Sequence, residues 1–305
     1  MRSPLSFGAA VVMMAALVAA PAGRAGTTKC TPPRAMWMWA TEAAGKAVKD
    51  EEARKAFLDF CEAPHGVKQA RITALYLETY SEERRREFIA AAHRRGIKVE
   101  FILGNSKFSA EDVEWEKKLL DGVFEYNAKV GVSERFDGIH FDVEPSTATW
   151  SQKAYRELLS YARSKIDAYN SANPHRMTLA ADIGFWWPIG GEDATAQYGD
   201  AMARCDYVVC MAYRDGAKRQ LDAAVAQAQE AKRRGIGFWI GCETGELPGQ
   251  DHVTYYEEGW GCLEEAMGQI PGLFEKQDLN LAGIAVHHYD SYVSLPKQAR
   301  ANAGQ

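Results

Sequence analysis

Three titratable side chains share one face of the segment FDGIHFDVE, residues 136–144. The segment has the composition of a β-strand, and side chains along a strand point alternately to its two faces. One face is apolar and can pack on helices, whereas the other carries His140, Asp142 and Glu144. Because isolated charges are costly to bury, we expect the polar face to line the interior near an opening where chemistry takes place.

Asp142 and Glu144 are spaced so that their carboxyl groups interact. Residues two apart on a strand are separated by roughly 6.6 Å, and their carboxylates can approach to about 5 Å. Two negative charges at about 5 Å repel by about 3 kcal/mol at an effective dielectric near 20, which corresponds to roughly two pKa units. One carboxyl group should therefore keep its proton near neutral pH, with His140 as a hydrogen-bond partner of Asp142. Such a pair suits cleavage of a glycosidic bond; a polar cluster that merely closes a barrel is the alternative.

The elements that could position these residues alternate along the chain. One predicted helix runs from Ser81 to a terminating Gly96, and another ends at Gly235. Strands and helices in alternation predict a single-domain (β/α)8 TIM barrel of the α/β class, with a doubly wound sheet as the runner-up. In such a barrel the carboxyl ends of the strands carry the chemistry. The eight strand candidates are 34–40, 72–80, 97–104, 136–144, 177–187, 205–214, 236–244 and 281–292.

Two of these strands resemble the signature segments of the family 18 glycoside hydrolases, the chitinase family. That family carries DGxDxDxE at the end of the fourth barrel strand and Met-x-Tyr on the sixth strand. The matching residues are Asp137, Gly138, Asp142 and Glu144 in the first motif and Met211, Ala212 and Tyr213 in the second. The eight-strand pattern extends the resemblance loosely over residues 35–292.

The resemblance implies a role for three residues. Glu144 would be the general acid that protonates the leaving oxygen. Asp142 would orient the 2-acetamido group of the substrate, which itself attacks the anomeric carbon, and Tyr213 would hydrogen-bond that group. The expected partner is an oligo- or polysaccharide, and we predict neither a cofactor nor a metal.

The chain also departs from the family pattern. His140 replaces the middle Asp of the acidic series, and Pro145 replaces the aromatic residue that commonly follows the Glu. The eighth strand lacks the Trp that floors the sugar site in that family, although His288, Tyr289 and Tyr292 could line the same region. These departures indicate a divergent relative.

Polar and aromatic residues at the ends of other strands are expected to bind the sugar, because aromatic faces stack on sugars and carboxylates bind hydroxyl groups. Trp37 shares a strand face with Trp39, so at least one of the two is expected in the core. The candidate substrate-binding residues are His140, Trp39, Glu78, Asp182, Trp186, Met211, Arg214, Glu243, His288 and Tyr289.

Three other functions remain open. A two-glutamate retaining glycosidase would use Glu144 and Glu243 with carboxylates about 5 Å apart. A non-catalytic carbohydrate-binding protein on the same barrel is favoured by the departures from the chitinase pattern. A metal site could draw its ligands from His140, Asp142, Glu144, His287 and His288. The motifs HExxH, GxSxG and GxGxxG do not occur.

The amino terminus predicts export. Residues 1–25 have a positive start, a short apolar run and a small-residue cleavage region, which is the pattern of a signal peptide. The barrel domain is therefore predicted over 26–305, in a secreted or periplasmic protein. The apolar run is short for a membrane span, and the net charge of −5, without a basic stripe, argues against a nucleic-acid partner.

An oxidising compartment permits disulfides among the six cysteines. Cys30 and Cys61 flank the first strand–helix unit, and Cys242 and Cys262 flank the loop after a later strand, so we predict these two pairs. Cys205 and Cys210 are expected to be buried thiols on one strand.

Overall fold

The eight predicted strands close into a parallel barrel. In the computed structural model the described residues are 31–79, 82–144, 149–187 and 196–298. Each strand pairs with its neighbours in sequence order, and the last pairs with the first. The strands are β1 Arg34–Met38, β2 Ile72–Leu77, β3 Lys98–Asn105, β4 Gly138–Val143, β5 Thr178–Gly184, β6 Tyr207–Met211, β7 Gly237–Glu243 and β8 Gly283–His287.

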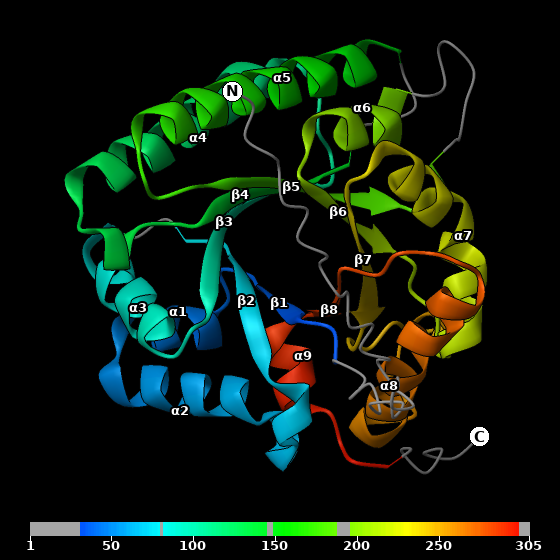
Figure 1. Ribbon diagram of the computed structural model, residues 1–305. Helices are drawn as coiled ribbons and strands as arrows, with labels where there is room; N and C mark the ends of the chain where they lie inside the picture. The colour runs from blue at the N-terminus through cyan, green and yellow to red at the C-terminus, as the bar shows by residue number, and fades with distance from the viewer. Residues whose placement is uncertain (1–30, 80–81, 145–148, 188–195, 299–305) are drawn as a thin grey trace, which may run out of the picture. The chain divides into compact units, whose positions relative to one another are not determined.

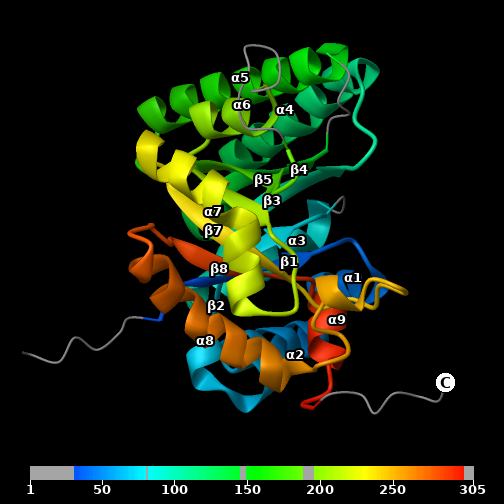
Figure 2. The same cartoon turned by 90° about the vertical axis from the view of Figure 1, so that its right-hand side faces the viewer.

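Helices surround the barrel, as Figure 1 shows. Helices α4 and α5 lie along β4 and β5, and the view after a quarter turn shows α7 and α8 over the β7 side (Figure 2). The helices are α1 Glu42–Lys49, α2 Glu51–Glu62, α3 Glu82–Arg94, α4 Val113–Lys129, α5 Thr149–Ala172, α6 Ala196–Arg204, α7 Ala217–Arg234, α8 Trp260–Lys276 and α9 Tyr289–Ser294.

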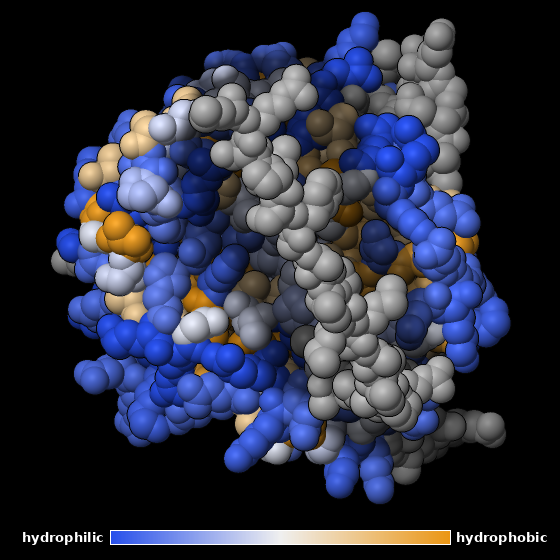
Figure 3. Space-filling view, in the orientation of Figure 1, coloured by the Kyte–Doolittle hydropathy of each residue, from blue (hydrophilic) through white to orange (hydrophobic). Residues whose placement is uncertain are grey.

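Two apolar layers hold the barrel together. The larger one lies between strands and helices and includes Ile139, Phe141 and Val143, so the apolar face of β4 packs outward as predicted. The smaller one fills the barrel interior with Ala35, Trp37, Tyr76, Ile102, Val209 and Ala285. The side of the molecule seen in Figure 3 is mostly hydrophilic where the described residues form its surface. Parallel strands that are buried on both faces in this way read as nearly continuous apolar segments in the sequence.

The predicted strand candidates correspond to the observed strands, but most observed strands are shorter. The largest difference is the candidate over 281–292, because β8 ends at His287 and the chain enters α9. The Ser291 hydroxyl accepts a hydrogen bond from the His288 backbone N–H and so closes the first turn of α9. The predicted helix ends at Gly96 and Gly235 are confirmed.

The prediction of a disulfide between Cys242 and Cys262 is wrong, because both residues have free thiols. The Cys242 sulfur instead lies 3.3 Å from the Gln220 side-chain nitrogen in the core. Cys61 is also a free buried thiol, and its predicted partner Cys30 lies outside the described residues, as does the predicted signal peptide. Cys205 and Cys210 are buried thiols as expected, although only Cys210 lies within β6.

No helix in the described part of the chain combines the length and the apolar character needed to cross a membrane.

Candidate active site

Asp142 and Glu144 lie at the carboxyl end of β4, where the barrel interior opens. Asp142 is half-buried near the end of the strand, and Glu144 follows it, also half-buried. Two residues before Asp142, on the same face of the strand, His140 is fully buried. The polar face of β4 thus leads from the closed interior to the solvent-reachable rim.

His140 is the centre of a buried polar network. Its Nε2 lies 2.9 Å from Oδ1 of Asp182 on β5, and its Nδ1 lies 3.5 Å from Oε2 of Glu100 on β3. Asp182 also accepts a hydrogen bond from the Trp37 indole N–H at 2.9 Å. The Tyr207 hydroxyl donates to Glu100 at 2.5 Å. Each carboxylate therefore has hydrogen-bond partners inside the barrel.

The network favours a charged imidazolium. Burial lowers the pKa of His140, but the charges and hydrogen bonds of Asp182 and Glu100 outweigh it and raise that pKa to about 9. The Tyr76 ring stacks on the imidazole with 3.8 Å between ring centroids. A cation beneath the rim partly compensates the acidic residues around it.

The expectation that His140 binds Asp142 is wrong, because its nitrogens face Asp182 and Glu100 instead. Oδ1 of Asp142 is buried and has no hydrogen-bond partner among the described residues. Burial, then repulsion from Asp182 and from Glu144, raises the pKa of Asp142 well above its ordinary value. Asp142 therefore tends to be protonated in the folded protein.

Glu144 is also shifted toward its protonated form. Burial is the largest cause of its raised pKa, and repulsion from Asp182 is the second. The repulsion between Asp142 and Glu144 that their spacing predicts is present, but for Asp142 it ranks behind burial and behind Asp182. A proton on Glu144 near neutral pH is what a general acid needs.

Tyr213 follows β6 and reaches the same opening. Its ring lies over Gly241 of β7, where an added Cβ would stand 2.9 Å from Tyr213 Cε1. Burial and the charges of Glu243, Asp182 and Asp142 raise its pKa well above the ordinary value, so it stays a neutral hydroxyl. Met211, two residues earlier, is buried at the end of β6.

A second polar group joins β7, β8 and β1. Glu243 Oε2 lies 2.7 Å from His287 Nδ1, and His287 Nε2 lies 2.9 Å from the Trp39 indole nitrogen. Glu243 Oε1 accepts hydrogen bonds from the backbone N–H groups of Thr244 and Gly245. Burial raises the pKa of Glu243, but its hydrogen bonds to His287 and to these N–H groups outweigh burial and lower it.

Trp39 lies half-buried across β3. A Cβ added to Gly104 would stand 2.8 Å from Cζ3 of the indole, so only a glycine leaves room for the ring there. Gly104 pairs with Asp142 in the register of β3 and β4. The indole is therefore next to the Asp142 strand position. As predicted, one tryptophan of β1, Trp37, is fully buried in the core.

The other predicted binding residues occupy different surroundings. Asp182 is buried inside the barrel, below the rim. Trp186 is 55% exposed after β5, and Arg214 lies with its guanidinium carbon 4.5 Å from the centre of the Phe185 ring. His288 Nδ1 is 3.6 Å from an Asp290 oxygen. Tyr289 packs on Phe57 and Phe60 of α2.

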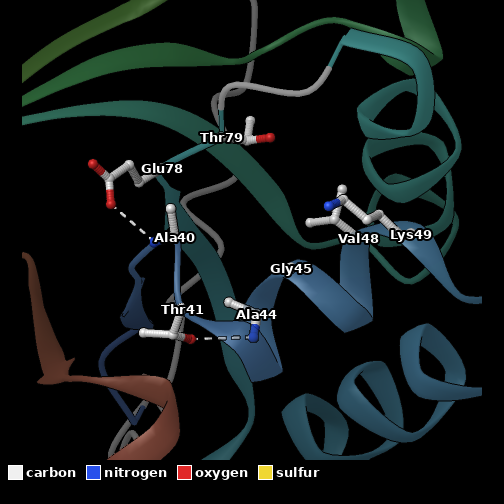
Figure 4. A pocket seen from close by; sticks show the side chains of 8 residues that line it. All are labelled: Ala40, Thr41, Ala44, Gly45, Val48, Lys49, Glu78 and Thr79. Carbon is white, nitrogen blue, oxygen red and sulfur yellow. Dashed lines mark hydrogen bonds between the residues drawn. The ribbon is translucent and has the colours of Figure 1, made fainter.

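Glu78 follows β2 and lines a separate pocket of about 390 Å³ between α1 and the ends of β1 and β2 (Figure 4). Its Oε2 accepts a hydrogen bond from the Ala40 N–H at 2.9 Å. The pocket is also lined by Thr41, Ala44, Val48, Lys49 and Thr79.

Sequence reasoning missed three participants in this interior: Glu100 as a partner of His140, Tyr207 as a partner of Glu100, and His287 as the inward residue of β8. The signal for His287 was the strand period, since Ala285 and His287 share the inward face. Within the described ranges no group of three or more His, Cys, Asp or Glu side chains is arranged to hold a metal ion.

Comparisons with known proteins point to one fold. No family model matches the sequence, and no curated protein matches it. Among solved structures, a GH18 chitinase from Pseudoalteromonas aurantia is similar with 13% identity and a TM-score of 0.55, covering 86% of this chain and 97% of that one.

Two further structures agree. A family 18 N-acetylglucosaminidase from Paenibacillus barengoltzii has 11% identity and a TM-score of 0.52, covering 85% of this chain and 96% of the other. A chitinase from Chromobacterium violaceum has 12% identity and a TM-score of 0.51, covering 86% and 97%. The chain therefore has the fold of these chitinase-type glycoside hydrolases, at low sequence identity.

Proposed function

We propose that the protein hydrolyses a glycosidic bond, with Glu144 as the general acid. The observation that carries the proposal is the placement of Asp142 and Glu144 together on the inward face of β4, half-buried at the barrel rim, with the pKa of both carboxyl groups raised. A protonated Glu144 can deliver its proton to the bridging oxygen. The chitinase-type fold supports a carbohydrate substrate.

Asp142 and Tyr213 assist in this proposal. The unprotonated oxygen of Asp142 can accept a hydrogen bond from the N–H of a substrate acetamido group, and the neutral Tyr213 hydroxyl can donate one to the oxygen of that group. These two groups would hold the acetamido oxygen in position to attack the anomeric carbon. The substrate class is therefore a saccharide with an N-acetylamino sugar on the side of the cleaved bond that keeps the anomeric carbon.

The test compares wild type with Glu144→Gln on aryl glycosides and oligosaccharides of N-acetylglucosamine. The variant keeps the size of the side chain but cannot act as an acid, so turnover should fall by at least about 10²-fold, the usual contribution of general acid catalysis. Turnover that survives the change would contradict the assignment of Glu144. Aryl glycosides with a good leaving group should lose less, because they need less protonation.

A second candidate function is carbohydrate binding without catalysis. It is favoured by the His140–Asp182 pair, because His140 stands where the chitinase pattern has an acidic residue and pairs with Asp182 instead of Asp142. Oδ1 of Asp142 then has no hydrogen-bond partner within the described part of the chain. Binding of an oligosaccharide by wild type without any cleavage decides for this function. The retaining mechanism with Glu144 and Glu243 is less supported, since both Glu243 oxygens already accept hydrogen bonds within the protein.

We further propose that the protein is exported, on the amino-terminal pattern of residues 1–25.

A further inference from the structure

We propose that Trp39 is the aromatic platform on which the substrate sugar stacks, and that Glu243 and His287 are positioning residues that fix the indole through one chain of hydrogen bonds. This proposal rests on one part of the proposed function, namely that a saccharide binds at the opening of the barrel. It does not require that the saccharide is cleaved.

The direction of each hydrogen bond from Trp39 through His287 to Glu243 follows from which atoms can donate and which can only accept. An indole nitrogen can only donate, so His287 Nε2 must accept from Trp39 Nε1–H at 2.9 Å. His287 Nδ1 then carries the ring proton and donates to Glu243 Oε2 at 2.7 Å. Glu243 Oε1 accepts from the N–H groups of Thr244 at 2.8 Å and Gly245 at 2.6 Å. The arrangement requires a neutral His287 of one tautomer and a Glu243 that only accepts.

The position of the indole suits a stacking platform. Trp39 is half-buried, and one part of its ring rests on Gly104, the register partner of Asp142. The His287 ring at its edge also contacts Tyr213, with 5.9 Å between ring centroids. The hydrogen bonds therefore connect the platform to the side of the opening that holds Tyr213. Aromatic faces in such places bind the C–H faces of sugars.

An amide at position 243 cannot replace the carboxylate. If the Gln oxygen accepts from Thr244 and Gly245, its NH2 group faces His287 Nδ1 and forces the proton to Nε2, where it meets the Trp39 N–H. If the amide is turned over, its NH2 group faces two backbone donors instead. Either orientation puts donor against donor. The first orientation leaves one donor–donor contact and the second leaves two, so we expect the first. Glu243→Gln should therefore move the His287 proton to Nε2 and release the indole, although the substitution changes neither size nor shape.

The experiment measures binding of a chito-oligosaccharide by calorimetry in a Glu144→Gln background, where turnover does not interfere. Trp39→Ala should weaken binding by about tenfold or more, the loss of a stacked aromatic surface. Trp39→Phe should cost only about threefold, since it keeps a ring without the N–H. Glu243→Gln should weaken binding by several fold with little change in the melting temperature.

The decisive variant is the double substitution Trp39→Phe with Glu243→Gln. Phenylalanine has no N–H to clash with a switched His287, so the double variant should bind no worse than Trp39→Phe alone. Additive losses would contradict the positioning role, as would an unchanged affinity in Glu243→Gln. A merely structural role for Glu243 predicts additivity and a lowered melting temperature instead.

Nitrogen-15 NMR of the histidine rings gives an independent readout. The proposal predicts a neutral His287 protonated at Nδ1 in the Glu144→Gln protein and at Nε2 once Glu243→Gln is added; any other pattern overturns it. A wild-type protein that binds no saccharide at millimolar concentration overturns the platform. Binding without cleavage contradicts the hydrolase but supports the platform, so the two failures are distinguishable.

Discussion

His140 and Asp182 form an ion pair inside the barrel, with 2.9 Å between Nε2 and Oδ1 and with neither side chain reachable by solvent. Glu100 approaches the other ring nitrogen. Three strands are thus joined through charges beneath the rim. The cost of burying Asp182 and Glu100 is offset only as long as the cation lies between them.

We expect replacement of His140 to destabilise the fold. In His140→Asn the carboxylates of Asp182 and Glu100 lose the cation between them, and removal of one partner of a buried ion pair costs roughly 3–5 kcal/mol. Denaturant unfolding at pH 7 measures the loss. The matched control is His252→Asn, at an exposed position of the short 3-10 helix Asp251–Val253, which should change stability by less than about 0.5 kcal/mol. A similar loss for both variants would contradict the prediction.

The same pair makes stability depend on pH. The folded-state pKa of His140 is raised to about 9. A raised pKa gives stability that is fully present below the unfolded value near 6.5 and is lost as the pH rises through about 9. The loss should be roughly 3 kcal/mol for a shift of this size. Wild type should lose this stability between about pH 6.5 and pH 9, and the His140→Asn variant should not; parallel curves would argue against a cationic His140.

Asp142→Asn should stabilise the folded protein at neutral pH. Because burial raises the pKa of Asp142, its ionised form is disfavoured in the folded state and its protonated form gives stability that fades as the pH rises. An amide removes this penalty, so unfolding at pH 7 should require roughly 1–3 kcal/mol more. Below about pH 3.5 both proteins are uncharged there and the difference should vanish. Activity should fall in the same variant, and a destabilised Asp142→Asn protein would refute the assigned burial cost.

The pH dependence of hydrolysis should report Glu144. A general acid must be protonated, and burial together with Asp182 raises the pKa of Glu144. The turnover rate should therefore fall on the alkaline side at a pH above the ordinary range of a glutamate. The pH dependence of the turnover rate, measured with an aryl glycoside and with an analogue that has a poorer leaving group, gives this alkaline limb. Glu78→Gln, at the end of β2, should leave the limb in place; an alkaline limb that moves with it would point to a different acid.

Gly104→Ala should weaken sugar binding without unfolding the barrel. The new methyl group would stand 2.8 Å from the Trp39 ring, which must shift from its place beside Asp142. We expect KM to rise by roughly tenfold, the equivalent of one displaced aromatic contact. Gly122→Ala in α4 is the control, because no atom of another described segment lies within 4 Å of the added Cβ and a helical alanine is slightly stabilising. Equal effects of the two changes would contradict the close contact.

The free thiols can be checked by differential alkylation. Cys61, Cys205, Cys210 and Cys242 are buried, and burial raises the pKa of each, that of Cys242 to about 12. Cys262 is half-buried and should react first with iodoacetamide, followed by the others only after denaturation. Mass spectrometry of the native protein without reductant should show Cys242 and Cys262 unlinked. A peptide that joins these two cysteines would overturn the structural result.

Much of the fold was predictable because strand composition and helix ends are local. Short stretches of sequence are enough to recognise the alternating apolar residues of β4 and the end of α7 at Gly235. The partner of His140 was not predictable in the same way. Asp182 lies 42 residues later in the chain, and the choice between it and Asp142 depends on the register of β4 and β5 and on the direction of the side chains.

The same limit applies to β8. The period of the strand places His287 inward, but the end of the strand depends on pairing with β7 and on the Ser291 hydroxyl, which accepts a hydrogen bond in the first turn of α9. Tyr289 was therefore expected at the opening and instead packs on α2. For the cysteines, proximity in the sequence of Cys242 and Cys262 was misleading, because Cys242 lies in the core beside Gln220.

The buried charges on β3, β4 and β5 also restrict how the sequence can change. An Asp at position 140 alone, which would restore the acidic series of the chitinases, would crowd three carboxyl groups into a space without solvent. Glu100 or Asp182 would have to lose its charge at the same step or beforehand. A change between this interior and a chitinase-like one therefore requires paired replacements. A replacement at position 140 alone would destabilise the fold, because it leaves buried carboxylates without a compensating cation.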